Sequence, residues 1–206
     1  GINYKVQTKE QLNEVFYNAA RNNELIPNFS TEYPYHSAVV DGSSYPEDGG
    51  VMIFSKWPIV NEAQMVYSVC DGSDCLSAKG VMYVELDKMG MPYHVFGTHT
   101  QAWPDAVSIA VRLQQLGEMY AFMESQNIPS DEAVIFGGDM NVNKANSNQN
   151  LEYIPMLDTL HVNEPTYLGH PYTYDPNYNN YASGSDFEYL DFLFSENTHF
   201  CAYSVT

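Results

Sequence analysis

Residues 133–141 read Ala-Val-Ile-Phe-Gly-Gly-Asp-Met-Asn, an apolar run that stops abruptly at two glycines, an acid and an amide. The run predicts a buried strand. Side chains two residues apart on extended backbone point to the same side, so Asp139 and Asn141 could act on one substrate. The glycines would let a phosphate come close to the backbone. A Gly-Gly turn with a capping aspartate explains the same residues about equally well.

A second apolar run ends in the same manner. Residues 95–99 read Val-Phe-Gly-Thr-His, so His99 would follow a strand as Asp139 does. Residues just beyond strand ends converge on one rim of a layered sheet, where sites are usually built. His99 is therefore a candidate proton donor or phosphate ligand, although a lone histidine at a strand end is more often a satisfied polar residue. The two endings together predict a shared pocket.

Other segments alternate between strand and helix patterns. Strands are predicted where short apolar or alternating runs are bounded by turn residues, at residues 51–55, 80–86, 93–97 and 189–194. Met89-Gly90 would form a hairpin turn. Apolar residues at helical spacing predict helices over 12–23 and 104–126. The stretch between the strands at 133–136 and 189–194 is rich in tyrosine, proline and asparagine and is predicted to be irregular. This interleaving indicates a layered α and β architecture.

The composition limits the partners. At 206 residues, 44% of them hydrophobic, the chain fits one domain over residues 1–206. Its 26 acidic against 8 basic residues give a net charge of −18, which should repel nucleic acids because their binding depends on Lys and Arg at phosphates. No stretch approaches the apolar length that spans a bilayer, and nothing at Gly1 resembles a leader. We expect a soluble chain from which any signal peptide is already gone.

The three cysteines are Cys70, Cys75 and Cys201. Cys70 and Cys75 enclose a turn-forming sequence and could close as a disulfide in an oxidising compartment. Two reduced thiols beside a loop are the alternative, and the disulfide is only slightly favoured over it. Zinc is less favoured, because no second cysteine pair or histidine stands at zinc spacing. Cys201 is then left over, which hints that sequence is missing.

Three further acids could bind a cation. Glu47 and Asp48 precede Gly49-Gly50 and could supply hard oxygen ligands, although a turn with two acids is the ordinary explanation. Glu14 lies on the first predicted helix, where a solvated helical face explains it, and nothing local overturns that.

Taken together and in order, these pieces resemble the bacterial-type neutral sphingomyelinases, or sphingomyelinases C, of the endonuclease/exonuclease/phosphatase superfamily. The matching strings fall within residues 12–194, at 12–16, 32–35, 46–51, 54–59, 97–101, 137–144 and 188–191. The most specific are Pro-Glu-Asp-Gly-Gly at 46–50 and Gly-Gly-Asp-Met-Asn-Val-Asn-Lys at 137–144. Gly-Thr-His at 97–99 is shared by much of the superfamily.

The resemblance implies a catalytic centre built on magnesium. Glu14 would hold the ion, which polarises a nonbridging phosphate oxygen. Asp139 and Asn141 would orient the attacking water and the phosphate. His99 would stabilise the pentavalent phosphorus or assist departure of the ceramide oxygen, and Asp191 would support the site through hydrogen bonding.

The resemblance also implies a fold, a second ion and a location. The fold would be α+β, a layered α/β/β/α sandwich of the DNase I-like type, incomplete at both ends. Asn18, Glu47 and Asp48 match a second cation site at the edge of the molecule, associated with membrane engagement. Manganese or cobalt could replace magnesium. The enzyme would be secreted and would hydrolyse sphingomyelin in the outer leaflet of a membrane to ceramide and phosphocholine, by in-line attack of water.

Both ends of the chain depart from the family pattern. Gly1 to Gln11 does not resemble the family's first strand, which bears an asparagine near the metal. The family's Ser-Asp-His segment, whose histidine is the general base, has no match, and His199 stands in a different context. Loss of such a base typically lowers the rate by about 10²–10⁴-fold. An inactive lipid-binding homologue and a nuclease or other phosphodiesterase of the superfamily are therefore the alternatives.

Overall fold

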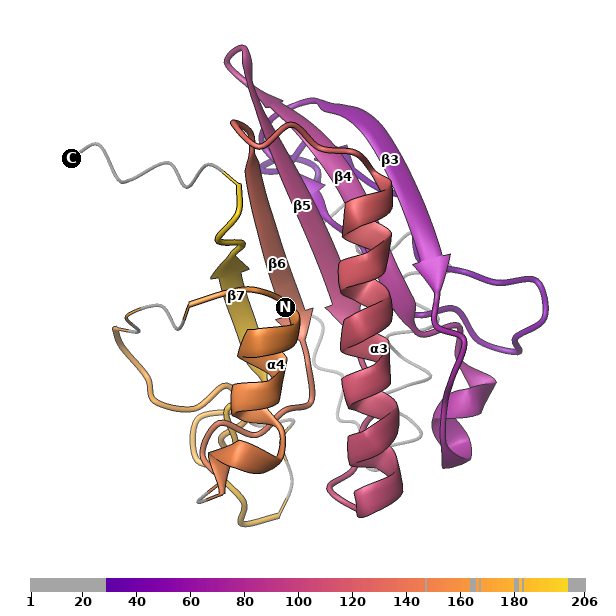
Figure 1. The fold of residues 1–206 in the computed structure, drawn as a ribbon, viewed down its shortest axis with the longest axis vertical. Coiled ribbons are helices and arrows are strands. Elements are labelled where there is room, and N and C mark those ends of the chain that lie inside the picture. Colours follow the sequence, from indigo (N-terminus) through magenta and orange to yellow (C-terminus); the bar gives the residue numbers. More distant parts are fainter. Residues whose placement is uncertain are drawn as a thin grey trace.

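The computed structural model describes residues 29–146, 148–163, 166, 168–179, 182 and 184–199. Its centre is a five-stranded sheet whose strand order follows the chain (Figure 1). The strands are β3 (Ile59–Val66), β4 (Gly80–Lys88), β5 (Met91–His99), β6 (Ala133–Asp139) and β7 (Asp191–Ser195). β5 and β6 are parallel, and the other neighbouring pairs are antiparallel. The predicted hairpin, with its turn at Met89-Gly90, is therefore confirmed as β4 and β5.

Two helices, α3 (Ala106–Ser125) and α4 (Tyr153–Thr159), cover one face of the sheet (Figure 1). α3 begins where Asp105 accepts hydrogen bonds from the N–H groups of Val107 and Ser108. This confirms the helix predicted over 104–126. Aromatic and aliphatic side chains fill the space between helices and sheet, among them Tyr83, Phe96, Leu116, Met119, Met123, Phe136, Met156, Leu160, Phe192 and Phe194.

Residues 35–55 cover the other face of the sheet. β1 (Tyr35–His36) pairs with β2 (Phe54–Ser55), while Val40 and Val51 pack against Met82, Val84 and Leu86 of β4. Helices, sheet and this segment form three layers, and the predicted α+β class is confirmed. In the part of the chain that the structure describes, no helix combines the length and apolarity needed to cross a membrane.

The strand predicted over 51–55 is wrong in extent, because only its last two residues form β2. The carbonyl oxygens of Val51 and Ile53 still accept hydrogen bonds, from the N–H groups of Val40 and Ser37. The run is thus buried or partly buried, and hydrogen-bonded, without forming a regular strand throughout. An apolar run reports burial, and burial does not require strand geometry.

The sequence patterns missed β3 and α4. Most side chains of β3 are partly or fully exposed, so this edge strand lacks the apolar alternation that predicts a strand. α4 lies in the stretch predicted to be irregular, and that prediction is wrong there. Pro155 sits in the first helical turn, where N–H groups have no intrahelical acceptor, so the proline is tolerated. The helix predicted over 12–23 lies outside the described residues.

Candidate active site

Three of the residues expected in the site lie side by side where adjacent strands meet one edge of the sheet. His99 on β5 is the register partner of Asp139 on β6, and Asp139 is in turn the partner of Asp191 on β7. His99 Nε2 lies 3.8 Å from Asp139 Oδ2. The structure therefore brings together an imidazole and two carboxylates that the sequence places far apart.

Gly138 allows β5 and β6 to come close at this edge. Its φ is +130°, and an added Cβ would stand 2.0 Å from the carbonyl oxygen of Thr98. Any larger residue would force the two strands apart. A cavity of about 410 Å³ opens beside them, lined by residues 50–53, 95–99 and 137–139. It is large enough for a phosphate headgroup and has His99 and Asp139 in its wall.

Asn141 is fixed next to Asp139 by two hydrogen bonds. Its backbone N–H donates to Asp139 Oδ1 at 2.9 Å, and its Nδ2 donates to the carbonyl oxygen of Thr100 at 3.0 Å. Asn141 has a φ of 50°, a left-handed conformation that asparagine tolerates better than most residues. The acid and the amide thus form one preorganised unit after the double glycine.

Lys79 is a site residue that the sequence interpretation missed. Its buried ammonium lies 2.6 Å from Asp74 Oδ2, donates to the Thr100 carbonyl at 2.8 Å and lies 3.4 Å from His99 Nε2. One signal was present: a lysine directly before an apolar strand, in a chain with only 8 basic residues. Lys79 adds a positive charge beside His99.

Burial and neighbouring charges shift the pKa values of Asp139 and Asp74 in opposite directions. Burial, reinforced by the carboxylate of Asp191, raises the pKa of Asp139 to about 6, against the opposing N–H of Asn141 and the charges of Lys79 and Arg112. Burial would also raise the pKa of Asp74, but the ammonium of Lys79 and the N–H of Ala102 outweigh it and lower that pKa. Asp139 can therefore exchange a proton near neutral pH, while Asp74 stays ionised.

Two side chains of α3 clamp the turn that follows His99 and Thr100. Arg112 Nη1 donates to the carbonyl oxygens of Gln101 at 2.6 Å and Trp103 at 3.0 Å. Gln115 Oε1 accepts from the Gln101 N–H at 2.7 Å. Arg112 is itself held by Glu152, which accepts from its Nε at 2.7 Å and lies 2.6 Å from its Nη2. This buried network fixes the backbone that carries the Thr100 carbonyl.

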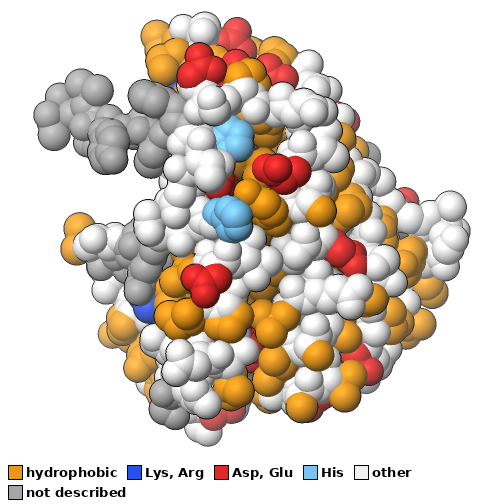
Figure 2. All heavy atoms as spheres, in the orientation of Figure 1, with side chains coloured by type: hydrophobic (Ala, Val, Ile, Leu, Met, Phe, Trp, Pro, Cys, Tyr) orange, Lys and Arg blue, Asp and Glu red, His pale blue; other side chains and the backbone are white. Residues whose placement is uncertain are grey.

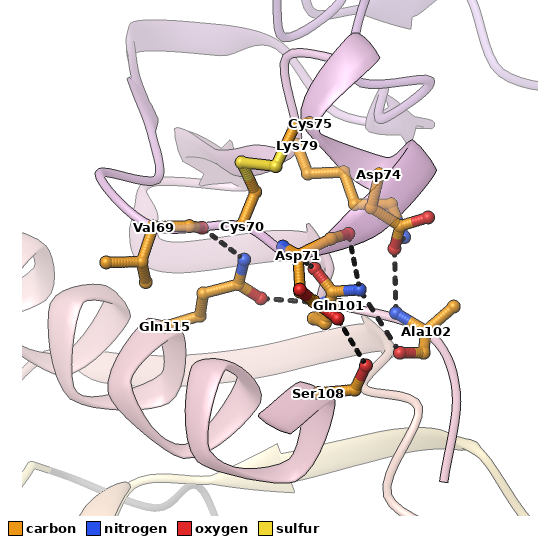
Figure 3. The surroundings of a disulfide bond; sticks show 10 residues. All are labelled: Val69, Cys70, Asp71, Asp74, Cys75, Lys79, Gln101, Ala102, Ser108 and Gln115. Carbon is orange, nitrogen blue, oxygen red and sulfur yellow. Dashed lines mark hydrogen bonds and ion pairs between the residues drawn. A yellow bond between two sulfur atoms is a disulfide. The ribbon is translucent and has the colours of Figure 1, made fainter. Parts of the chain in front are cut away.

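The predicted disulfide between Cys70 and Cys75 is present, and the reduced alternative is not (Figure 3). It closes a loop on which Asp71 and Asp74 both face the turn after β5. The side chain of Gln101 accepts from the Asp71 N–H at 2.8 Å, and Asp74 Oδ2 accepts from the Ala102 N–H at 2.8 Å (Figure 3). The cross-linked loop thus holds Asp74 against Lys79.

The remaining predicted residues do not join this cluster in the described part of the chain. Glu47 Oε2 accepts from Ser77 Oγ at 2.9 Å, and Asp48 Oδ1 accepts from the Gly50 N–H at 2.9 Å. These contacts are those of two acids in a turn. Nδ1 of His199 lies 2.7 Å from Oε2 of Glu196. Both residues follow the last residue of β7, whereas Asp191 is the first residue of that strand. Glu14, Asn18 and Cys201 lie outside the described residues.

Within the described ranges, no group of three or more His, Cys, Asp or Glu side chains is placed to hold a metal ion. Three side chains at this edge of the sheet nevertheless offer oxygen atoms as possible metal ligands. Asp139 and Asp191 present carboxylate oxygens, and Asn141 adds an amide. Hard oxygen donors suit magnesium better than a soft metal, so this edge fits part of a magnesium site.

Comparisons with known proteins assign the chain to a family. The model of the endonuclease/exonuclease/phosphatase family matches residues 12–205. The chain is 42% identical to sphingomyelinase C of Bacillus cereus over 212 aligned positions, which cover 91% of the chain and 63% of that relative. The chain thus spans less than two thirds of the length of this curated protein.

Solved structures give the same assignment. Sphingomyelinase C from Streptomyces griseocarneus is 32% identical with a TM-score of 0.78, over 88% of this chain and 68% of that one. A mutant of beta toxin from Staphylococcus aureus with bound magnesium ions is 36% identical with a TM-score of 0.79, over 87% and 68%. The chain belongs to the endonuclease/exonuclease/phosphatase family and, within it, to the bacterial-type neutral sphingomyelinases.

Proposed function

We propose that this chain is a metal-dependent phosphodiesterase that hydrolyses sphingomyelin to ceramide and phosphocholine. The observation that carries the proposal is the row of His99, Asp139 and Asp191 at one sheet edge. A cavity of about 410 Å³ adjoins this row. Relatives named sphingomyelinase C supply the substrate class.

Asp139 and Asn141 act on the attacking water. With a pKa of about 6, the Asp139 carboxylate is mostly ionised at neutral pH. It accepts a hydrogen bond from the water and takes its proton as the water oxygen bonds to phosphorus. Asn141 is already fixed by its bond to the Thr100 carbonyl, so little ordering is needed when substrate binds.

Lys79 and His99 meet the charge that develops on the phosphate. Their nitrogens lie 3.4 Å apart and donate to the nonbridging oxygens as negative charge concentrates at the pentavalent phosphorus. The bond from phosphorus to the ceramide oxygen breaks on the side opposite the water, the ceramide oxygen takes up a proton from solvent as it leaves, and Asp139 returns its proton to solvent. Phosphocholine then carries the oxygen that came from water.

Magnesium is the proposed cofactor, supported by the oxygen donors at this edge and by the magnesium in a relative. Glu14 would hold the ion beside Asp139 and Asn141. When bound, the ion polarises a nonbridging phosphate oxygen. Manganese or cobalt would substitute, and Asn18, Glu47 and Asp48 would hold a second ion at the edge of the molecule.

The proposed setting is extracellular, at sphingomyelin in an outer membrane leaflet. The Cys70–Cys75 disulfide supports an oxidising compartment. The net charge of −18 disfavours a nuclease, while a zwitterionic choline lipid needs no basic surface.

The test is release of phosphocholine from sphingomyelin vesicles, with magnesium and with chelator. We expect metal-dependent release by the chain, loss of release in Asp139→Ala, and retention in Asp131→Ala, which changes an exposed acid just before β6. Lipid binding without release would instead support an inactive homologue. Cleavage of DNA alone would support a nuclease.

A further inference from the structure

Segment 103–107 is exposed at every position, although Asp105 is its only polar residue. The exposed fraction is 48% for Trp103 and 59% for Val107. Leu76, which is 52% exposed, lies on the adjacent disulfide loop, which is joined to this segment by the bond between Asp74 and Ala102. We call Leu76 and residues 103–107 the apolar rim. Grouped apolar side chains on a surface mark interaction sites, whereas single ones do not.

Hydrogen bonds from Arg112 and to Asp105 fix the backbone of the apolar rim. Trp103 has a φ of 76°, a conformation that bulky residues rarely adopt. Such a conformation persists only where the surroundings impose it, and here the buried guanidinium of Arg112 binds the Trp103 carbonyl at 3.0 Å. Asp105 fixes the next residues by capping α3. The backbone that carries the indole is therefore fixed by the fold.

The rim lies directly beside the proposed site. It begins after Thr100 and Gln101, whose backbone atoms bind Lys79 and Arg112, and Leu76 follows Asp74, the partner of Lys79. The rim is therefore continuous with the backbone and the loop that hold Lys79 beside His99. A large, flat partner fits this arrangement better than a small ligand does.

The charges around the apolar rim indicate which kind of lipid surface it can bind. Asp105 lies within the rim and Asp71 lies beside it, bonded to Ser108, while Lys79 and Arg112 are buried against carboxylates. The face that carries α3 and α4 likewise shows acidic side chains among apolar ones and very few basic ones (Figure 2). Anionic lipid would be repelled. Zwitterionic choline lipid presents a quaternary ammonium outward, which acids and an indole face attract, and tryptophan favours the membrane interface.

We propose that the apolar rim docks on a zwitterionic phospholipid surface and holds the site against its headgroups. This inference rests on the proposed function and names the surface through which the chain reaches its substrate.

The chain contains two tryptophans, so replacing either one by phenylalanine leaves the other as the source of the tryptophan fluorescence. Trp57 lies under Lys88, 4.7 Å from Nζ to the ring centroid, at the end of β4 remote from the site. In the full chain with Trp57→Phe, emission from Trp103 should shift to shorter wavelength when phosphatidylcholine–sphingomyelin vesicles are added in chelator. In Trp103→Phe, emission from Trp57 should not shift. A shift from Trp57 alone would overturn the proposal.

Trp103→Ala should weaken vesicle binding by roughly tenfold, as expected for losing one buried apolar side chain. Val107→Ser should weaken it less, and Val60→Ser should not, because Val60 is 57% exposed at the far end of the sheet. Turnover of a water-soluble nitrophenyl phosphocholine should be unchanged in Val107→Ser and in Val60→Ser. Unchanged vesicle binding in both rim variants would overturn the proposal, even where hydrolysis is normal. Rim-dependent binding without hydrolysis would support the rim and contradict the proposed function.

Discussion

The ammonium of Lys79 lies 3.4 Å from Nε2 of His99 and 2.6 Å from Oδ2 of Asp74. A cation, an imidazole and an acid from three separate segments thus meet beside Asp139. Lys79 can serve a phosphate only while Asp74 and the Thr100 carbonyl hold it in place. This dependence makes the lysine a sensitive point for testing the site.

Lys79→Met should lower kcat by about 10²–10³-fold, the loss typical of removing one donor to a developing negative charge. It should also lower stability, because Asp74 would remain largely buried without its cation. Steady-state hydrolysis and urea unfolding of the same preparation would measure both effects.

Lys56→Met is the matched control for that change. Lys56 also pairs with an acid, Glu32 at 3.1 Å, but both side chains are more than half exposed. Such surface pairs contribute about 0–1 kcal/mol, so stability and turnover should barely change. Equal losses in the two variants would contradict a special role for Lys79.

Asp139 should make stability fall as pH rises from about 4 to about 6 in the absence of metal. Its pKa is raised from 3.8 to about 6, so over this range the unfolded chain releases the proton while the folded chain retains it. The unfolding free energy of the wild type minus that of Asp139→Asn should therefore decrease across that window. Urea unfolding at half-unit pH intervals, in chelator, would measure it.

Asp105→Asn provides a comparison of opposite sign. Hydrogen bonds from Ser108 and Val107 lower the pKa of Asp105, so its contribution is present above its unfolded pKa and is lost as pH falls. Wild-type stability relative to Asp105→Asn should therefore decrease toward acid. If both aspartates gave the same slope, the interpretation of Asp139 would be wrong.

Arg112→Met should destabilise the chain by about 3–5 kcal/mol, because it leaves Glu152 buried without its partner. The double variant Arg112→Met/Glu152→Met should recover most of this loss. Turnover should stay low in the double variant, since the carbonyls of Gln101 and Trp103 remain unclamped. Recovery of both stability and turnover would show that the clamp does not position the site.

Gly138→Ala should destabilise the chain by about 2–4 kcal/mol, since the added Cβ would stand 2.0 Å from the Thr98 carbonyl at a φ of +130°. Gly117→Ala in α3 is the control, because nothing lies within 4 Å of its Cβ position. It should stabilise by about 0.5–1 kcal/mol. Thermal unfolding of both variants decides the point, and a tolerated alanine at 138 would refute the close approach.

Strong local patterns made much of the fold predictable. The runs ending at His99 and Asp139 predicted β5, β6 and their shared edge, and helical spacing predicted α3. β3 was not predicted because none of its side chains is fully buried, and α4 was not predicted because it is short and contains Pro155. In both, tertiary packing rather than local pattern determines the structure.

The site was predictable where residues end strands and unpredictable where contacts join distant loops. The position of Lys79 before an apolar strand was a weak signal, because its role depends on contacts with His99 and Thr100, which lie about twenty residues further along the chain. Nothing in the sequence marks Arg112 for burial within the predicted helix, yet it is fully buried. Only folding shows that such residues are engaged.

The parallel pairing of β5 with β6 has a consequence for how the chain matures. His99 and Asp139 can become neighbours only after all of α3 has been synthesised and has crossed the sheet. A newly made polypeptide therefore passes through a period in which each strand edge is open and His99 and Asp139 are not yet neighbours. Long-range pairings of this kind form slowly, so the candidate site should assemble as one of the last events of folding.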